Sequence, residues 1–341
     1  MNINLRMSSI IPMLNFLRDL KNEQATLAQI TDIFNHPDYD FEFKRHGAAS
    51  KDPIIDYFLN LNTIKPSDIP VLRASRITEL RDKHELWLAA YENPQRYEQL
   101  HNSLKLFITD EMLAGVTAMV KRGLPEDADI GTIDVISTMS ISGSFGYVFD
   151  GAFHFDILRL TEDKLNYLPL LFAHEAHHLA MMNYESSFVD SFSLEEWYIH
   201  SFSGEGLAVK FCNNAEGTIS KPIYNDRPPN LGLDKFTMNY LNQRFDEALK
   251  VFEDTLTAIR LGKMSKDDIE KQLMEYWYNF HTEDQQPDEA PKLQQSFAYS
   301  FGNDFFGAIY DAFGREKLFE CVRYPLKALD YFKRAIDEVN N

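Results

Sequence analysis

The chain has 341 residues, 44% of them hydrophobic and 13% aromatic, which is typical of a folded protein and excludes an intrinsically disordered one. Its 34 basic and 52 acidic side chains give a net charge of −18 that would repel a phosphate backbone, so we expect no nucleic-acid partner. Two cysteines are too few for a disulfide framework, and no apolar run reaches the ~18 residues of a membrane span.

Residues 1–125 are predicted to be a helical N-terminal region, because apolar residues recur at helical spacing and prolines separate the helices. Residues 1–20 are predicted to form a helix rather than a signal peptide, since polar residues interrupt their apolar patch and no small-residue cleavage site follows. We therefore expect a soluble, cytoplasmic protein without a membrane partner. The sequence does not indicate an oligomeric state.

The composition changes after Pro125. Segments 132–141 and 146–158 are rich in β-branched and aromatic residues, so we predict two strands of a small antiparallel sheet. Helices are then expected over 169–182, 194–211, 235–260, 266–280 and 294–338, with loops at 225–232 and 281–292. The predicted fold class is α+β and predominantly helical, with residues 126–341 as a second region.

The segment FAHEAHHLA, Phe172–Ala180, places a His-Glu-x-x-His motif in a predicted helix with apolar flanks. His174 and His178 are four residues apart, so they share one helix face and can bind one metal ion. Glu175 follows the first ligand and can act as the general base, as in zinc peptidases. Hydrogen-bonded core histidines are the alternative. His177 is expected to point away from the ion, in a supporting or surface role.

A catalytic zinc ion needs a third protein ligand. The acidic candidates for this ligand further along the chain are Asp190, Glu195, Glu196 and Glu205. Ser193 and Glu196 form a predicted capping box, and Glu195 lies in the first helical turn, where a carboxylate is favourable in any case. Glu205 lies between two glycines within a helix, which indicates close backbone packing there. We predict Glu205 as the third ligand, with Glu195 and Glu196 as alternatives.

His174-Glu175-x-x-His178, followed by Glu205 in GEGLA, resembles the gluzincin zinc peptidases, the thermolysin and aminopeptidase N group. The same elements are similar to the HExHH and EGLA segments of bacterial predicted zinc-dependent peptidases. The resemblance covers residues 130–215. It implies a zincin-like catalytic core, Zn²⁺ as the cofactor and a peptide or protein substrate.

The resemblance also implies a residue that stabilises the oxyanion. In the aminopeptidase branch this is a tyrosine in a Tyr-x-x-Gly segment, which corresponds here to Tyr299 in YSFG, with His281 in reserve. The alternative for Tyr299 is a place in the core, because aromatic residues recur at helical spacing over 297–313.

Gluzincins bind an extended peptide along an edge strand, which implies Gly146, Tyr147 and Val148 as substrate-binding residues. The glutamate with which aminopeptidases recognise a free amine is missing from this stretch. Exopeptidase activity is therefore not indicated, unless Asp150 takes over that role.

The pattern as a whole predicts a zinc-dependent hydrolase, most plainly a metallopeptidase with Glu175 as its base. A hydrolase acting on an ester or a small molecule would use the same residues. A non-catalytic helical binding protein with a structural or vestigial zinc ion is the other alternative. Retention of Glu175 favours catalysis, because a structural site has no need of a base.

Overall fold

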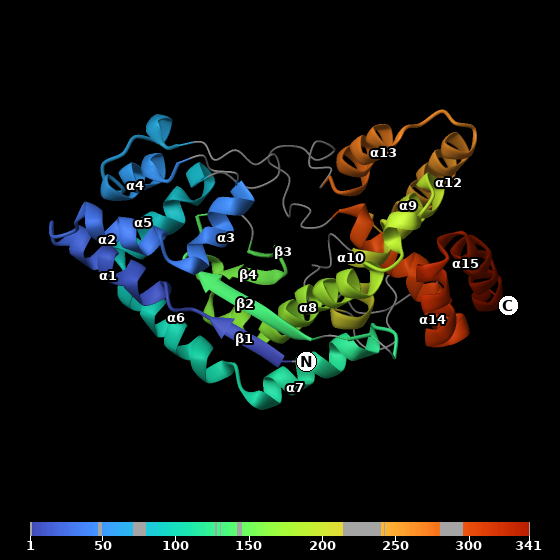
Figure 1. Cartoon of the computed structure of the whole chain (residues 1–341), viewed down its shortest axis with the longest axis horizontal. Helices are drawn as coiled ribbons and strands as arrows, with labels where there is room; N and C mark the ends of the chain where they lie inside the picture. Colours follow the sequence, from blue (N-terminus) through green and yellow to red (C-terminus); the bar gives the residue numbers. More distant parts are fainter. Residues whose placement is uncertain are drawn as a thin grey trace. The chain divides into compact units, whose positions relative to one another are not determined.

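The computed structural model describes residues 2–46, 50–70, 80–126, 128–129, 131–141, 145–213, 240–241, 243–279 and 296–340 (Figure 1). The predicted loops at 225–232 and 281–292, with His281, lie outside these residues. The chain packs as two units. The first unit consists of Met1–Gly115 and Gly131–Pro169, and the second of Val116–Ile130 and Leu170–Asn341.

The first unit is a set of short helices around a small sheet. Its helices are α1 (Ile10–Lys21), α2 (Leu27–Phe34), α3 (Pro37–His46), α4 (Asp52–Leu59), α5 (His84–Glu92) and α6 (Pro94–Phe107), while α7 (Asp110–Arg122) continues into the second unit. Local signals start several of them. Thr26 and Gln29 form a capping box at α2, and the Asn93 side chain caps α6 ahead of a proline in its first turn.

The sheet has four strands in the order β1-β2-β4-β3. Their bounds are β1 Asn2–Arg6, β2 Thr132–Thr138, β3 Gly146–Phe149 and β4 Ala152–Asp156. β1 and β4 both pair with β2 in parallel, and β3 pairs with β4 in the antiparallel sense. The predicted antiparallel sheet is therefore wrong. The sheet is mixed, because β3 and β4 form an antiparallel hairpin and β4, not β3, pairs with β2.

Two local features explain the other differences from the predicted strands. Asp150 and Gly151 both have positive φ, 46° and 77°, and this turn divides the predicted strand 146–158 into β3 and β4. Residues 2–6, predicted to be helical, instead form β1, and the helix begins only at Ile10. Every residue of β4 is buried, so the hairpin places this strand at the centre of the unit.

The second unit is helical. Its elements are α8 (Leu168–Glu185, all but its first two residues), α9 (Leu194–His200), α10 (Ser203–Ala208), a π-helical turn (Val209–Asn213), α12 (Phe245–Arg260), α13 (Lys266–Gln272) with a second π-turn (Leu273–Trp277), α14 (Phe297–Arg323) and α15 (Pro325–Asn340). A short 3₁₀-helix of this unit lies at Val189–Ser191. The described part of the first unit has four more, at Pro66–Asp68, Leu80–Lys83, Ile157–Arg159 and Glu162–Tyr167. The predicted helix 194–211 is thus divided into α9, α10 and a π-turn.

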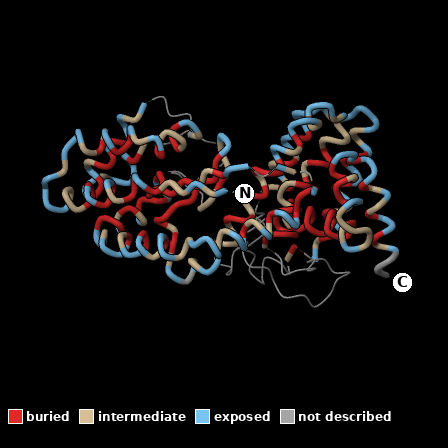
Figure 2. Tube along the Cα trace, turned by 60° about the horizontal axis from the view of Figure 1, so that its bottom comes forward, coloured by how far each residue is buried: buried red, intermediate tan, exposed pale blue. Residues whose placement is uncertain are grey.

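Aromatic side chains form the core of the second unit. The ring of Phe202 lies 4.6 Å from that of Trp277 and 5.3 Å from that of Phe301, measured between centroids. Phe297, Phe301 and Phe305 of the predicted aromatic stripe are buried, so this part of the stripe is core. Figure 2 shows buried residues gathered inside each unit.

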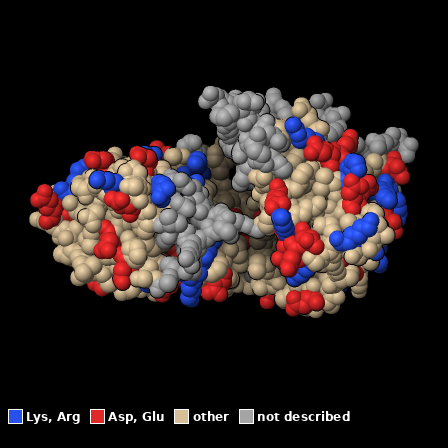
Figure 3. Space-filling model, turned by 90° about the horizontal axis from the view of Figure 1, so that it is seen from above, with Lys and Arg blue, Asp and Glu red and all other residues tan. Residues whose placement is uncertain are grey.

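The surface shown in Figure 3 has acidic and basic side chains interspersed over the described residues of both units. No helix in the described part of the chain is both long enough and apolar enough to cross a lipid bilayer.

Candidate metal centre

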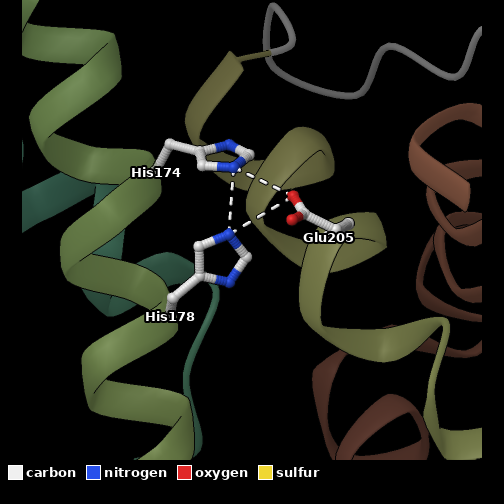
Figure 4. Close-up of side chains that lie close together, drawn as sticks. All are labelled: His174, His178 and Glu205. Atoms are coloured by element: carbon white, nitrogen blue, oxygen red, sulfur yellow. Dashed lines mark hydrogen bonds and ion pairs between the residues drawn. The ribbon is translucent and has the colours of Figure 1, made fainter. Parts of the chain in front are cut away.

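Three side chains of the second unit converge on one point (Figure 4). His174 and His178 project from α8, and Glu205 projects from α10. His174 Nε2 lies 3.0 Å from His178 Nε2 and 3.1 Å from Glu205 Oε2, and His178 Nε2 lies 3.3 Å from the same oxygen. The predicted group of two imidazoles and one carboxylate is therefore assembled in the structure.

The spacing of these atoms fits a zinc ion. In a tetrahedral site with bonds of about 2.0–2.1 Å, the ligand atoms lie about 3.3 Å apart. The three observed separations are 3.0–3.3 Å. Imidazole nitrogen and carboxylate oxygen are also donors that zinc accepts. The donor set and its dimensions therefore suit this ion.

Helix α8 presents the two histidines because its flanking residues are buried. Phe172, Ala173 and Ala176 are each at most 1% exposed, so they hold the helix in the core. His174 and His178 are one turn apart on the face of α8 that these buried residues do not occupy. Their ring centroids are 4.6 Å apart. Both rings keep partial exposure, which gives access to the metal centre.

Glycine brings Glu205 to this point. A Cβ atom on Gly206 would lie 2.2 Å from the backbone of Gly302, so α10 and α14 cross in backbone contact. A Cβ atom on Gly204 would lie 4.0 Å from the His178 ring. The predicted close packing around Glu205 is present, and the neighbour of Gly206 is α14 rather than the motif helix.

The group carries coupled charges. Burial alone would lower the pKa of His174, but its hydrogen bond to Glu205, with the charges of Glu205 and Glu175, raises it to about 9. Burial would raise the pKa of Glu205, but His178 and His174 hold it well below its usual range. The negative potential that favours a proton here also favours a divalent cation, whose binding would release that proton.

Asn213 is a member of the site that the sequence did not indicate. Its Oδ1 accepts a hydrogen bond of 2.5 Å from His174 Nδ1. Asn213 ends the π-turn that follows α10, eight residues after Glu205. The sequence offers no signal for it, since a helix of regular period would turn it away from the ligand face.

Glu175 and Tyr299 both lie near the ligands. The charge of Glu175 contributes to raising the pKa of His174 and of Tyr299. The Tyr299 ring is nearly parallel to the His174 ring, at 10° and 6.3 Å, and the charge of Glu205 also contributes to raising the pKa of the Tyr299 hydroxyl. Burial is the main cause that raises the pKa of this hydroxyl well above its usual value, so it stays protonated. Tyr299 is partly exposed, unlike Phe297 and Phe301 on either side of it.

A model of the family described as "Putative zinc dependent peptidase (DUF5700)" matches residues 30–341. The chain belongs to this family. The match spans His174, Glu175, His178, Glu205 and Asn213, whereas β1 and α1 precede it. No curated protein and no solved structure matches the sequence. The family description agrees with the predicted zinc-dependent peptidase, while the gluzincin resemblance stays a prediction.

The segment 174–178 contains a third histidine, His177, that is not part of the candidate metal group. His177 is buried, and its Nε2–H donates to the carbonyl oxygen of Gly123 at 2.8 Å. Burial lowers the pKa of His177 to about 3, so the ring is neutral. A Cβ atom on Gly123 would lie 2.8 Å from this ring, which explains the glycine. Of the two roles predicted for His177, a supporting one fits and a surface one does not.

The alternative carboxylate ligands have other partners. Glu195 accepts a hydrogen bond of 2.6 Å from Arg260, and Glu196 closes the predicted capping box with Ser193. Asp190 lies in a short 3₁₀-helix before α9. Among the described residues, Glu205 is the one carboxylate that the structure groups with the two histidines.

The predicted substrate-binding residues lie in the first unit. They are Gly146, Tyr147 and Val148 of β3, which is an edge strand of the sheet. Tyr147 is buried, and its ring stacks on that of His154 in β4 at 4.7 Å. Their role toward a substrate stays a prediction.

Proposed function

We propose that this protein is a zinc-dependent metallopeptidase of the gluzincin type with a zincin-like catalytic core. The observation that carries the proposal is the convergence of His174, His178 and Glu205 at zinc-ligand spacing, with Glu175 beside them. Membership of a family described as zinc-dependent peptidases supports it. The substrate class that follows from the family description is peptides or proteins.

The number of ligands favours a catalytic ion over a structural one. The group within the described residues has three side chains, and a tetrahedral ion would therefore keep one position for water or substrate. A structural site is typically closed by a fourth protein ligand. Glu175 adds a group that a structural site does not use.

The proposed mechanism assigns proton transfer to Glu175. A bound zinc ion would lower the pKa of water and polarise the scissile carbonyl. Glu175 accepts the proton of the attacking water and delivers it to the leaving nitrogen. His174, His178 and Glu205 would hold the ion, and their fixed positions would avoid reorganisation during the reaction.

Tyr299 is the proposed donor to the oxyanion. Its hydroxyl is protonated, and its ring lies 6.3 Å from that of His174, one of the proposed metal ligands. A small rotation would direct the hydroxyl hydrogen at a developing negative charge. Gly146, Tyr147 and Val148 are the proposed substrate-binding residues, because an edge strand offers backbone hydrogen bonds to an extended peptide.

Metal analysis combined with peptide digestion tests the proposal. The full-length chain is expected to bind one zinc ion and to cleave a mixed peptide library. Glu175→Gln is the matched control, since it keeps the three ligands but cannot accept the proton. It should retain zinc and lose about 10²- to 10⁴-fold of the activity.

The possible outcomes separate the alternatives. Zinc binding without cleavage, even of unfolded proteins, would point to a binding protein with a structural ion. Cleavage of esters but not of peptides would change the substrate class and keep the chemistry. Full activity in Glu175→Gln would exclude this residue as the base.

A further inference from the structure

We infer that Asn213 is a positioning residue of the metal centre, holding the His174 ring in the tautomer and orientation that direct Nε2 at the ion. The inference rests on the proposed function and adds a residue outside the His-Glu-x-x-His and GEGLA segments. The contact that carries it is the 2.5 Å hydrogen bond between His174 Nδ1 and Asn213 Oδ1.

The chemistry of this bond sets the state of the ring. A neutral imidazole carries one hydrogen, and only the nitrogen without it can bind a metal. Asn213 Oδ1 can only accept, so the hydrogen is on His174 Nδ1. Once a bound ion displaces the proton that His174 shares with Glu205, Nε2 directs its lone pair at the point shared with His178 and Glu205. Partners of this kind orient histidine ligands in metal sites generally.

The π-turn at Val209–Asn213 explains how Asn213 reaches the ring. In a regular α-helix, residues eight apart differ by about 80° around the axis, so Asn213 would not share the face of Glu205. A π-turn closes its hydrogen bonds over five residues and so accommodates about one extra residue. The eight residues from Glu205 to Asn213 then turn about as far around the axis as seven residues of a regular α-helix. That rotation is roughly 20° short of two full turns. Glu205 and Asn213 thereby share one face.

The direction of the two helical segments agrees with this. A Cβ atom on Gly204, near the start of α10, would contact His178, while Asn213, at the end of the π-turn, contacts His174. Segment 203–213 therefore runs antiparallel to α8. One short segment supplies both the third ligand and the residue that orients the first ligand. The neighbour Cys212 faces the interior and is 1% exposed, whereas Asn213 is only partly buried.

Zinc affinity measured by competition with a chromogenic chelator tests the inference on the full-length chain. Asn213→Leu keeps the branched shape and removes the acceptor, so zinc affinity should fall about 10- to 100-fold. Asn213→Asp keeps an acceptor oxygen and should bind zinc at least as tightly as the natural chain. Cys212→Ala alters a buried neighbour in the same turn and should leave affinity unchanged.

The inference would be overturned if Asn213→Leu bound zinc as tightly as the natural chain. It would also be overturned if Asn213→Asp bound zinc as weakly as Asn213→Leu. His174→Ala distinguishes this failure from that of the proposed function. Unchanged zinc binding in His174→Ala would discard the metal centre itself, whereas binding lost there but kept in Asn213→Leu would discard only the role of Asn213. If circular dichroism shows that the leucine variant does not fold, Asn213→Ala takes its place in the same comparison.

Discussion

Glu205 decides the chemistry of the proposed metal centre, because it is the only carboxylate among the three proposed ligands. Its carboxylate lies between two imidazoles and balances half the charge of a divalent ion. The same charge raises the pKa of the neighbouring His174. Removing it would leave two neutral rings facing each other, a pair that binds zinc weakly on its own.

We therefore expect Glu205→Gln to lower zinc affinity by on the order of 100-fold or more. This loss is larger than the one expected for removing a residue that only orients a ligand, such as Asn213. Glu195→Gln is the matched control, since Glu195 lies ten residues earlier and pairs with Arg260. It should keep natural affinity. Isothermal titration with zinc measures both. Natural affinity in Glu205→Gln would transfer the ligand role to another carboxylate.

Glu42 shows a different use of buried charge, in the first unit. The carboxylate is fully buried and accepts hydrogen bonds from Ser140 Oγ at 3.0 Å and from the Ile141 amide at 2.6 Å. It also lies 3.2 Å from His154 Nε2. Burial alone would raise the pKa of Glu42, but His154, with Thr138, lowers it from 4.5 to about 2. These contacts tie α3 to the sheet.

This shift predicts the acid sensitivity of the first unit. Because the folded pKa of Glu42 lies below its unfolded value, its contribution is complete above about pH 4.5 and is lost as the pH falls toward 2. The loss is on the order of 3 kcal/mol. Glu42→Gln should be less stable at pH 7 and should have a flatter stability curve over that range. Hydrogen exchange of β2 amides at several pH values measures it.

A surface carboxylate of the same unit provides the comparison. Glu92 pairs with Lys21, and its side chain is 68% exposed. Glu92→Gln should change stability by less than about 1 kcal/mol. A stability curve for Glu42→Gln as steep as that of the natural chain would assign the acid sensitivity to other groups.

At the scale of elements, the crossing of α10 and α14 holds the metal centre together. Gly206 and Gly302 let the two backbones touch. Each glycine lies close in sequence to a site residue, Glu205 in α10 and Tyr299 one turn earlier in α14. The electrostatic interaction of Tyr299 with Glu205 depends on this close approach.

Gly302→Ala tests the crossing. The added Cβ atom would lie 2.3 Å from the Phe202 carbonyl oxygen, so the helices would have to move apart. We expect a loss of about 1–3 kcal/mol in unfolding free energy and weaker zinc binding. Gly115→Ala in α7 is the control, because its Cβ atom meets nothing within 4 Å. It should be neutral or stabilise by up to ~1 kcal/mol. Natural stability and zinc affinity in Gly302→Ala would contradict the argument.

The elements that the sequence predicted well are those defined by local signals. The motif helix was predicted over 169–182 and spans Leu168–Glu185, because its apolar flanks and its spacing lie within one segment. β1 was missed, since its partner β2 lies about 130 residues away and no local pattern indicates that pairing. The Asp150–Gly151 turn did have a local signal, the Asp-Gly pair typical of tight hairpins.

The same distinction applies to the site. His174, His178 and Glu205 were predicted because motif spacing and flanking glycines are visible in one dimension. Asn213 could not be predicted, since its direction depends on a π-turn that changes the helical register. Its contact with His174 exists only after two helices have packed.

At the scale of the whole molecule, the family match extends over both units, whereas the candidate metal group lies in the second unit alone. The match covers residues 30–341 and so includes most of both units, while every ligand lies in the second. Zinc binding should therefore stabilise the fold of α8, α10 and α14 first. The amides of β2 and β4 in the first unit provide an internal reference.

Removal of zinc by a chelator tests this. At a zinc concentration 100-fold above the dissociation constant, binding stabilises the folded state by about 2.7 kcal/mol. Chelation should then speed the exchange of the protected amides in α8 and α10 by about 100-fold, because their opening disrupts the ligand group. Amides of β4 should change little. Glu205→Gln, whose affinity is expected to be at least about 100-fold lower, should show at most about a twofold difference between the two conditions. Equal acceleration in both units of the natural chain would contradict a metal centre confined to the second.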